Sequence, residues 1–142
     1  MHRVQSCYKL TLQEIGNIEK VISGSRLENL PHDKAIVKLR NSLKYMIEIV
    51  AYLELLEKYY ESAYNKPARG LTDLIQEFNK DLDYIRKNAL IEETRLKKDL
   101  SKGELLIQDY GNRQLFGDVE EKIRGIVIKT KEQINRLKLE LD

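Results

Sequence analysis

One stretch of the chain limits its possible folds more than any other. Residues 33–65 contain neither glycine nor proline, the two residues that most often interrupt a helix. The apolar positions in this stretch alternate between spacings of three and four, which places them on one face of a helix. With a rise of about 1.5 Å per residue the predicted helix is about 50 Å long, so other segments must cover its apolar face. The positions on that face are Ile36, Leu39, Leu43, Met46, Val50, Leu53, Tyr60 and Tyr64.

A second long helix is predicted from residue 71 or 72 to residue 102. Pro67 and Gly70 separate it from the first, and we expect Gly70 to permit a left-handed turn at this corner. Short connections join antiparallel neighbours, so the two helices should form one long helical hairpin. Gly103 is the predicted end of the second helix. Its apolar face comprises Leu71, Leu74, Ile75, Phe78, Leu82, Ile85, Ala89, Leu96 and Leu100.

Two further helices are predicted to cover this hairpin. The first spans residues 4–22 and ends before Ser23–Gly24–Ser25. The last begins at Asp118, which can cap it together with Glu121 three residues later. The chain is therefore predicted to be all-α, an antiparallel bundle of about four helices in a single domain over residues 1–142. The apolar face of the first helix holds Val4, Tyr8, Leu12, Ile15, Ile18 and Ile22, and the coiled-coil-like seam of the last holds Val119, Ile123, Val127, Thr130, Ile134, Leu137 and Leu141.

Residues 104–117 carry the weakest pattern in the chain. Two apolar runs, 105–107 and 115–116, flank a Gly111–Asn112 pair, and such a pair between apolar runs is a signal for a β-hairpin. An isolated two-stranded ribbon is only marginally stable in water. We therefore favour a short helix followed by a loop, with the hairpin as the alternative.

The charges of the first long helix run against its dipole, because basic residues lie in its first third and acidic residues follow. The second long helix does not correct this, since an antiparallel hairpin brings its own bases to the same end. The last helix does, if it packs antiparallel to the second. That arrangement sets three acids beside the basic end and four bases towards the acidic end: Asp118, Glu120 and Glu121, then Lys129, Lys131, Arg136 and Lys138.

Composition excludes several classes of protein. Hydrophobic residues make up 42% of the 142 residues and charged residues 34%, which is too apolar and too regularly patterned for a disordered chain. No apolar run approaches the ~20 residues that span a bilayer, and the first residues lack the apolar core of a signal peptide. We therefore expect a soluble, cytoplasmic protein without a membrane partner. The single cysteine, Cys7, allows no intrachain disulfide, and we expect it to be a buried, inert thiol.

The residues that usually carry catalysis or bind metals are scarce. Only two histidines occur, His2 and His32, and we expect both to be exposed. No glutamate has a histidine three residues later, as the di-iron bundles require. No glycine-rich phosphate loop and no calcium-binding loop occurs either. The sequence therefore predicts a non-enzymatic protein without metal or cofactor.

Three tyrosines form the sharpest surface feature. Tyr45, Tyr52 and Tyr59 repeat every seven residues, which aligns them within about 20° along the first long helix. Tyrosine combines an apolar ring with a polar tip and suits a partly wet interface. The three residues are predicted to contact a protein partner or a second copy of the chain. Alternatively, they cover the first helix at the edge of the core. The main functional hypothesis is thus an interaction or scaffold subunit that self-associates or binds a partner through its hairpin.

The alternative function is nucleic-acid binding by basic helix faces. Tyrosines beside cations can stack on the bases of a single strand. However, Glu48 and the acids from Glu54 to Glu61 flank the tyrosines and would repel phosphates, and the net charge is only +2. The residues predicted to bind in this case are Lys34, Lys38, Arg40, Lys44, Arg86, Lys87, Lys97 and Lys98.

Overall fold

The computed structural model describes residues 2–101 and 110–141, with side chains described for residues 2–88 and 115–138. Within this part of the chain the secondary structure is helical throughout and contains no strand, which confirms the all-α class. A short 3₁₀ helix, η1, lies between the first two α-helices. The elements are α1 (His2–Ile22), η1 (Leu27–Asn29), α2 (His32–Tyr64), α3 (Arg69–Ser101) and α4 (Tyr110–Leu141).

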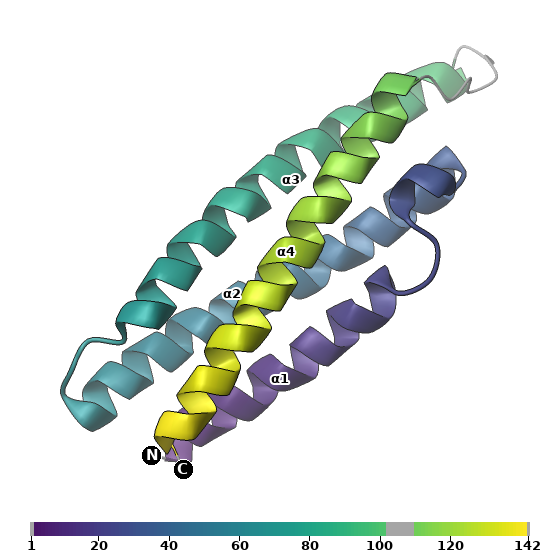
Figure 1. Cartoon of the computed structure of the whole chain (residues 1–142). Coiled ribbons are helices and arrows are strands. Elements are labelled where there is room, and N and C mark those ends of the chain that lie inside the picture. The colour runs from purple at the N-terminus through teal and green to yellow at the C-terminus, as the bar shows by residue number, and fades with distance from the viewer. Residues whose placement is uncertain (1, 102–109, 142) are drawn as a thin grey trace.

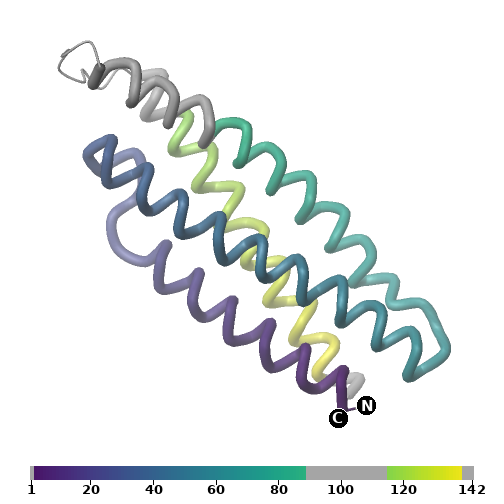
Figure 2. Tube along the Cα trace, turned by 180° about the vertical axis from the view of Figure 1, so that it is seen from behind, coloured from purple at the N-terminus to yellow at the C-terminus, as the bar shows by residue number. Residues whose placement is uncertain are grey.

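The four α-helices form an antiparallel bundle in which each helix packs on two neighbours (Figure 1). Successive helices run in opposite directions, and contacts between α1 and α4 close the ring. The predicted hairpin of two long helices is confirmed as α2 and α3. From behind, α2 lies in front, with α1 and α3 on either side and α4 beyond it (Figure 2). One side of α2 therefore faces away from the rest of the bundle.

The buried apolar side chains of all four helices form one continuous core. The predicted faces of α2, α3 and α4 supply most of it, as far as their side chains are described. On α1 the buried face is rotated from the predicted one, because Thr11 is fully buried and Leu12 only half-buried. The Thr11 hydroxyl donates a hydrogen bond of 2.7 Å to the carbonyl of Cys7. This local bond removes the cost of burying the hydroxyl group, so a threonine can take a core position.

The corner between α2 and α3 depends on an asparagine. Asn65 adopts the left-handed conformation (φ 52°, ψ 40°), and its N–H donates to the carbonyl of Glu61 at 2.9 Å. The prediction that Gly70 makes this turn is wrong, since Gly70 is the second residue of α3. A Cβ at this position would overlap the terminal amide of the Gln133 side chain of α4, which would have to turn aside.

The last helix begins eight residues before the predicted start. Asp118 does not cap α4, which is already helical from Tyr110 and includes Gly117. A β-hairpin at Gly111–Asn112 is excluded for the same reason. Leu115 and Phe116 pack on the core and stabilise the added turns, and the backbone of Gly117 lies against the carboxylate of Glu28. The remainder of the stretch, with the predicted helix end at Gly103, lies outside the described residues.

Candidate protein-interaction surface

The side of α2 that faces away from the core carries a line of apolar residues. Val37, Ile47, Ala51 and Leu55 are all exposed. At 3.6 residues per turn they fall within an arc of about 80°, opposite the buried side of the helix. We call these four residues the outer stripe. The exposed fractions of the three large side chains are 55% for Val37, 41% for Ile47 and 39% for Leu55.

The outer stripe stands out from the rest of the described surface. Single exposed apolar residues are common on soluble proteins and need no explanation. Among the described side chains, however, five large apolar residues are exposed, and three of them lie on this one arc of α2. The other two, Leu10 and Ile128, lie on α1 and α4. This grouping on one helix face is what makes the outer stripe a candidate binding surface.

The predicted tyrosine line borders the outer stripe on the side of α1. Tyr45, Tyr52 and Tyr59 are all half-buried, and Tyr45 and Tyr59 pack against the core. The guanidinium carbon of Arg3, from α1, lies 5.5 Å from the centre of the Tyr59 ring. The ammonium of Lys44 lies 5.9 Å from the Tyr45 ring. The tyrosines thus lie between the contact of α1 with α2 and the outer face of α2.

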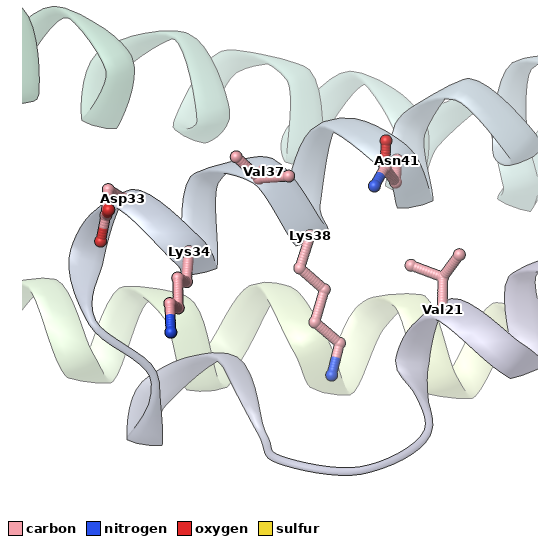
Figure 3. A pocket seen from close by; sticks show the side chains of 6 residues that line it. All are labelled: Val21, Asp33, Lys34, Val37, Lys38 and Asn41. Carbon is pink, nitrogen blue, oxygen red and sulfur yellow. The ribbon is translucent and has the colours of Figure 1, made fainter.

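A shallow groove opens at the start of α2 (Figure 3). It encloses about 380 Å³ and is lined by Val21 of α1 and five residues of α2, among them Val37 and Lys38. The ammonium of Lys38 donates hydrogen bonds to the carbonyls of Ser23 (3.3 Å) and Ser25 (2.5 Å). Lys38 therefore holds the loop after α1 in place. The groove continues the outer stripe at its Val37 end.

The residues predicted to bind nucleic acid differ in their exposure to solvent. Lys34, Arg40, Lys44, Arg86 and Lys87 are exposed, whereas Lys38 is half-buried. Burial is the main influence that lowers the pKa of the Lys38 ammonium. The Thr72 hydroxyl donates to Glu57 at 2.5 Å, and this pairing of α2 with α3 brings residues 86 and 87 level with residue 43. The side chains of Lys97 and Lys98 lie outside the described part of α3.

Away from this surface, a buried carboxylate joins α4 to the loop before α2. The side chain of Glu120 is 1% exposed. It accepts the backbone N–H of Leu27 at 2.7 Å, and Arg124 and Arg26 lie 3.1 and 3.4 Å away. Arg124 also donates to the carbonyl of Ile22 at 2.7 Å, the last residue of α1. We call this set of contacts, with Lys38, the α4 junction.

The ion pairs at the α4 junction differ in part from the predicted charge pairing. Glu120 does lie near the basic end of α2, where its charge favours the protonated form of Lys38. Its direct partners, however, are arginines of the loop and of α4 itself, and Glu121 pairs with Arg26 at 2.5 Å. Reasoning from the sequence missed Arg26 and Arg124. The spacing of four between Glu120 and Arg124 was the one available signal.

At the other end of α4 the expected pairing is present in part. Lys129 forms an ion pair with Glu77 of α3, as the antiparallel arrangement predicts. Lys122 lies 3.9 Å from Asp81 of the same helix. Lys131 instead pairs with Glu19 of α1, at 3.1 Å. Ion pairs of lysines this exposed contribute little to the stability of the fold.

The prediction that His32 is exposed is wrong. It is the first residue of α2 and is 6% exposed, with its ring edge-on to Phe116 at 5.4 Å between ring centres. The early start of α4 supplies Phe116 and so buries the histidine. Cys7 is buried as predicted, and this burial raises the pKa of its thiol.

Neither a metal site nor a membrane span emerges from the described residues. No group of three or more histidine, cysteine or acidic side chains among them is placed to hold a metal ion. None of the helices, as far as they are described, is both long and apolar enough to cross a bilayer. Comparisons of the chain with models of protein families, with curated proteins and with solved structures found no match.

Proposed function

We propose that this chain is a non-enzymatic helical interaction subunit that binds a protein through the outer face of α2. The observation that carries the proposal is the outer stripe, Val37, Ile47, Ala51 and Leu55, exposed on the side of the helix opposite the core. Covering such a stripe with another helix removes apolar surface from water, at about 25 cal/mol per Å².

The surroundings of the stripe support this role. Tyr52 is half-buried beside it and can keep its hydroxyl in water while its ring is covered by a partner. The groove at Val37 gives the surface a concave end. The helix beneath is rigid, since its opposite side is buried in the core along its whole length. A rigid surface loses little entropy on binding.

Site-specific cross-linking in the living cell tests the proposal. A photoreactive benzoylphenylalanine replaces Ala51 at the centre of the stripe, and the matched control carries it at Gln76, an exposed position of α3. We expect irradiation to give discrete protein adducts from position 51 and none of the same kind from position 76. Absence of adducts at position 51, or equal adducts at both positions, would refute a docking role for this face.

A second candidate, nucleic-acid binding, is favoured by one observation. The hairpin brings exposed Arg86 and Lys87 of α3 level with the middle of α2, where Lys44 and Arg40 are exposed. A surface that contacts phosphates through these residues would bind more weakly as salt increases. Titration of labelled single-stranded RNA and duplex DNA at low salt tests this. Loss of binding in the Lys44→Glu/Lys87→Glu variant would support it, and no binding by the native chain would exclude it.

A further inference from the structure

Two glutamates face each other at the middle of the contact between α1 and α2. At one end of this contact, the guanidinium of Arg3 on α1 lies over the ring of Tyr59 on α2. Glu14 comes eleven residues after Arg3, and Glu48 comes eleven residues before Tyr59. Because the two helices are antiparallel, this count places the two glutamates level with each other.

The opposite end of the contact gives the same register. Just past the end of α1, the ammonium of Lys38 donates hydrogen bonds to the carbonyls of Ser23 and Ser25. Ten residues along α2 from Lys38 lies Glu48, and ten residues back from the point midway between the two serines lies Glu14. The register therefore agrees at both ends, and it sets one carboxyl group of each helix at the same level.

One carboxylate oxygen of Glu14 needs a hydrogen-bond donor. Glu14 is half-buried, and the side-chain amide of Asn17 donates to its Oε1 at 3.4 Å. Its Oε2 is buried and has no donor among the described residues. A buried oxygen of this kind costs free energy, and two ionised carboxylates that face each other add repulsion. A proton held between Glu14 and Glu48 removes both costs.

We propose that Glu14 and Glu48 share one proton across the contact of α1 with α2, and that loss of this proton loosens the middle of α1. In the protonated pair, the carboxyl group of Glu14 donates a hydrogen bond to the carboxylate of Glu48. When both groups are ionised, that hydrogen bond is replaced by repulsion between the two helices. The attachment of α1 to the bundle is then weaker at neutral pH than in acid.

The charged and polar groups around the pair decide the direction of the effect. Lys44 of α2 and the hydrogen bond from Asn17 act to lower the pKa of Glu14. Burial, followed by the contact with Glu48, outweighs them and raises this pKa above 4.5. The stability that the proton contributes is therefore fully present below pH 4.5 and is lost as the pH rises through the raised pKa.

α4, the other helix that packs on α1, directs its basic groups to other turns. Lys131 pairs with Glu19 at 3.1 Å, and Arg124 donates to the carbonyl of Ile22 at 2.7 Å. Both contacts lie closer to the end of α1 than Glu14 does. The charge balance at the pair is therefore set by α2 and by α1 itself.

An NMR titration of the side-chain carboxyl carbons tests the shared proton. In the native chain the Glu14 signal should titrate with a midpoint above pH 4.5. Glu48→Gln removes the facing charge and should move the Glu14 midpoint towards 4.5, whereas the exposed control Glu54→Gln should leave it unchanged. A Glu14 midpoint that is the same in the native chain and in Glu48→Gln would overturn the shared proton.

Amide exchange tests the loosening of α1. Protection factors correct for the intrinsic effect of pH on exchange. Those of residues 12–16 should fall about threefold between pH 4.5 and pH 7 in the native chain, as expected for repulsion between partly exposed charges, and should stay constant in Glu14→Gln. Residues 73–77 of α3 are the internal reference and should change less. Equal losses in α1 and α3, or constant protection of α1 in the native chain, would overturn the local effect on α1.

Discussion

The outer face of α2 and the α4 junction differ in which groups they bury and which they expose. At the junction a carboxylate is buried, and Glu120 has a backbone N–H and two arginines as partners within the chain. On the outer face the apolar groups are exposed, and the charges around them are divided by sign along the helix. The junction therefore serves the fold of one chain, whereas the described helices leave the apolar groups of the outer face exposed.

The largest effect is expected from two isoleucines on opposite sides of α2. Ile49 is 1% exposed, and Ile49→Ala should reduce the free energy of unfolding by about 3.5 kcal/mol through lost burial and a cavity. Ile47 is 41% exposed, and Ile47→Ala should change it by less than about 0.5 kcal/mol in the monomer. Urea denaturation at low protein concentration measures both. Equal losses would mean that the outer face belongs to the core.

The next effect concerns the centre of the α4 junction. Glu120→Ala should cost about 3 kcal/mol, because it leaves the N–H of Leu27 without its acceptor and separates Arg26 and Arg124 from a buried partner. The matched control is Glu121→Ala, whose side chain is 65% exposed and pairs with Arg26. The control should lose a small fraction of that amount. Similar losses in the two variants would show that burial of Glu120 is not what stabilises the junction.

A smaller effect is expected where the two regions meet, at Lys38. Lys38→Met removes the hydrogen bonds to the carbonyls of Ser23 and Ser25 and should cost about 1 kcal/mol, since the side chain is only half-buried. Lys34→Met changes an exposed lysine of the same groove and should leave the unfolding midpoint unchanged. Amide exchange of residues 23–25 offers a second measurement, with faster exchange expected in Lys38→Met alone. Unchanged exchange would contradict the role of Lys38 in holding the loop.

The smallest effect depends on pH and concerns Glu14 of α1, beside Glu48 on α2. Burial, followed by the hydrogen bond and repulsion from Glu48, raises the pKa of Glu14 above its ordinary value of 4.5. The folded state therefore holds this proton more tightly than the unfolded state, and stability falls as pH rises through the raised pKa.

Glu14→Gln removes this penalty. It should raise the melting temperature at pH 7, and the gain should shrink as the pH is lowered towards 4.5. Glu54→Gln, an exposed control on the outer face, should show no such trend. A gain that is constant with pH would show that the variant acts by packing and not through the Glu14 proton.

The helices themselves could be predicted because their patterns are long. The hairpin was expected at 33–65 and from 71 or 72 onwards, and α2 and α3 begin and end close to these limits where they are described. The end of α1 at Ile22 follows from Ser23 and Gly24, which adopts φ 86°. Repeated spacings over many turns outweigh any single unfavourable residue.

Local signals were less reliable where tertiary contacts override them. Asp118 has the chemistry of a helix cap, yet burial of Leu115 and Phe116 extends α4 past it. Gly117 looked like a loop residue and instead accommodates Glu28. His32 follows a proline at a chain reversal, and only the arrival of Phe116 from a distant segment buries it.

Some features of the candidate surface can be predicted from the sequence, and others depend on tertiary contacts. The tyrosine spacing and the division of charge along α2 can be read from the chain, because both are properties of one helix. Whether Val37, Ile47 and Leu55 face water or a neighbouring helix cannot, since each is an ordinary core residue by type. Burial depends on which helices pack on which sides of α2, and those contacts form between segments far apart in the sequence. The sequence alone thus determined the helices and their polarity. Only the tertiary structure decided that the described helices leave one apolar stripe of α2 exposed and that the Glu120 carboxylate is buried among its partners.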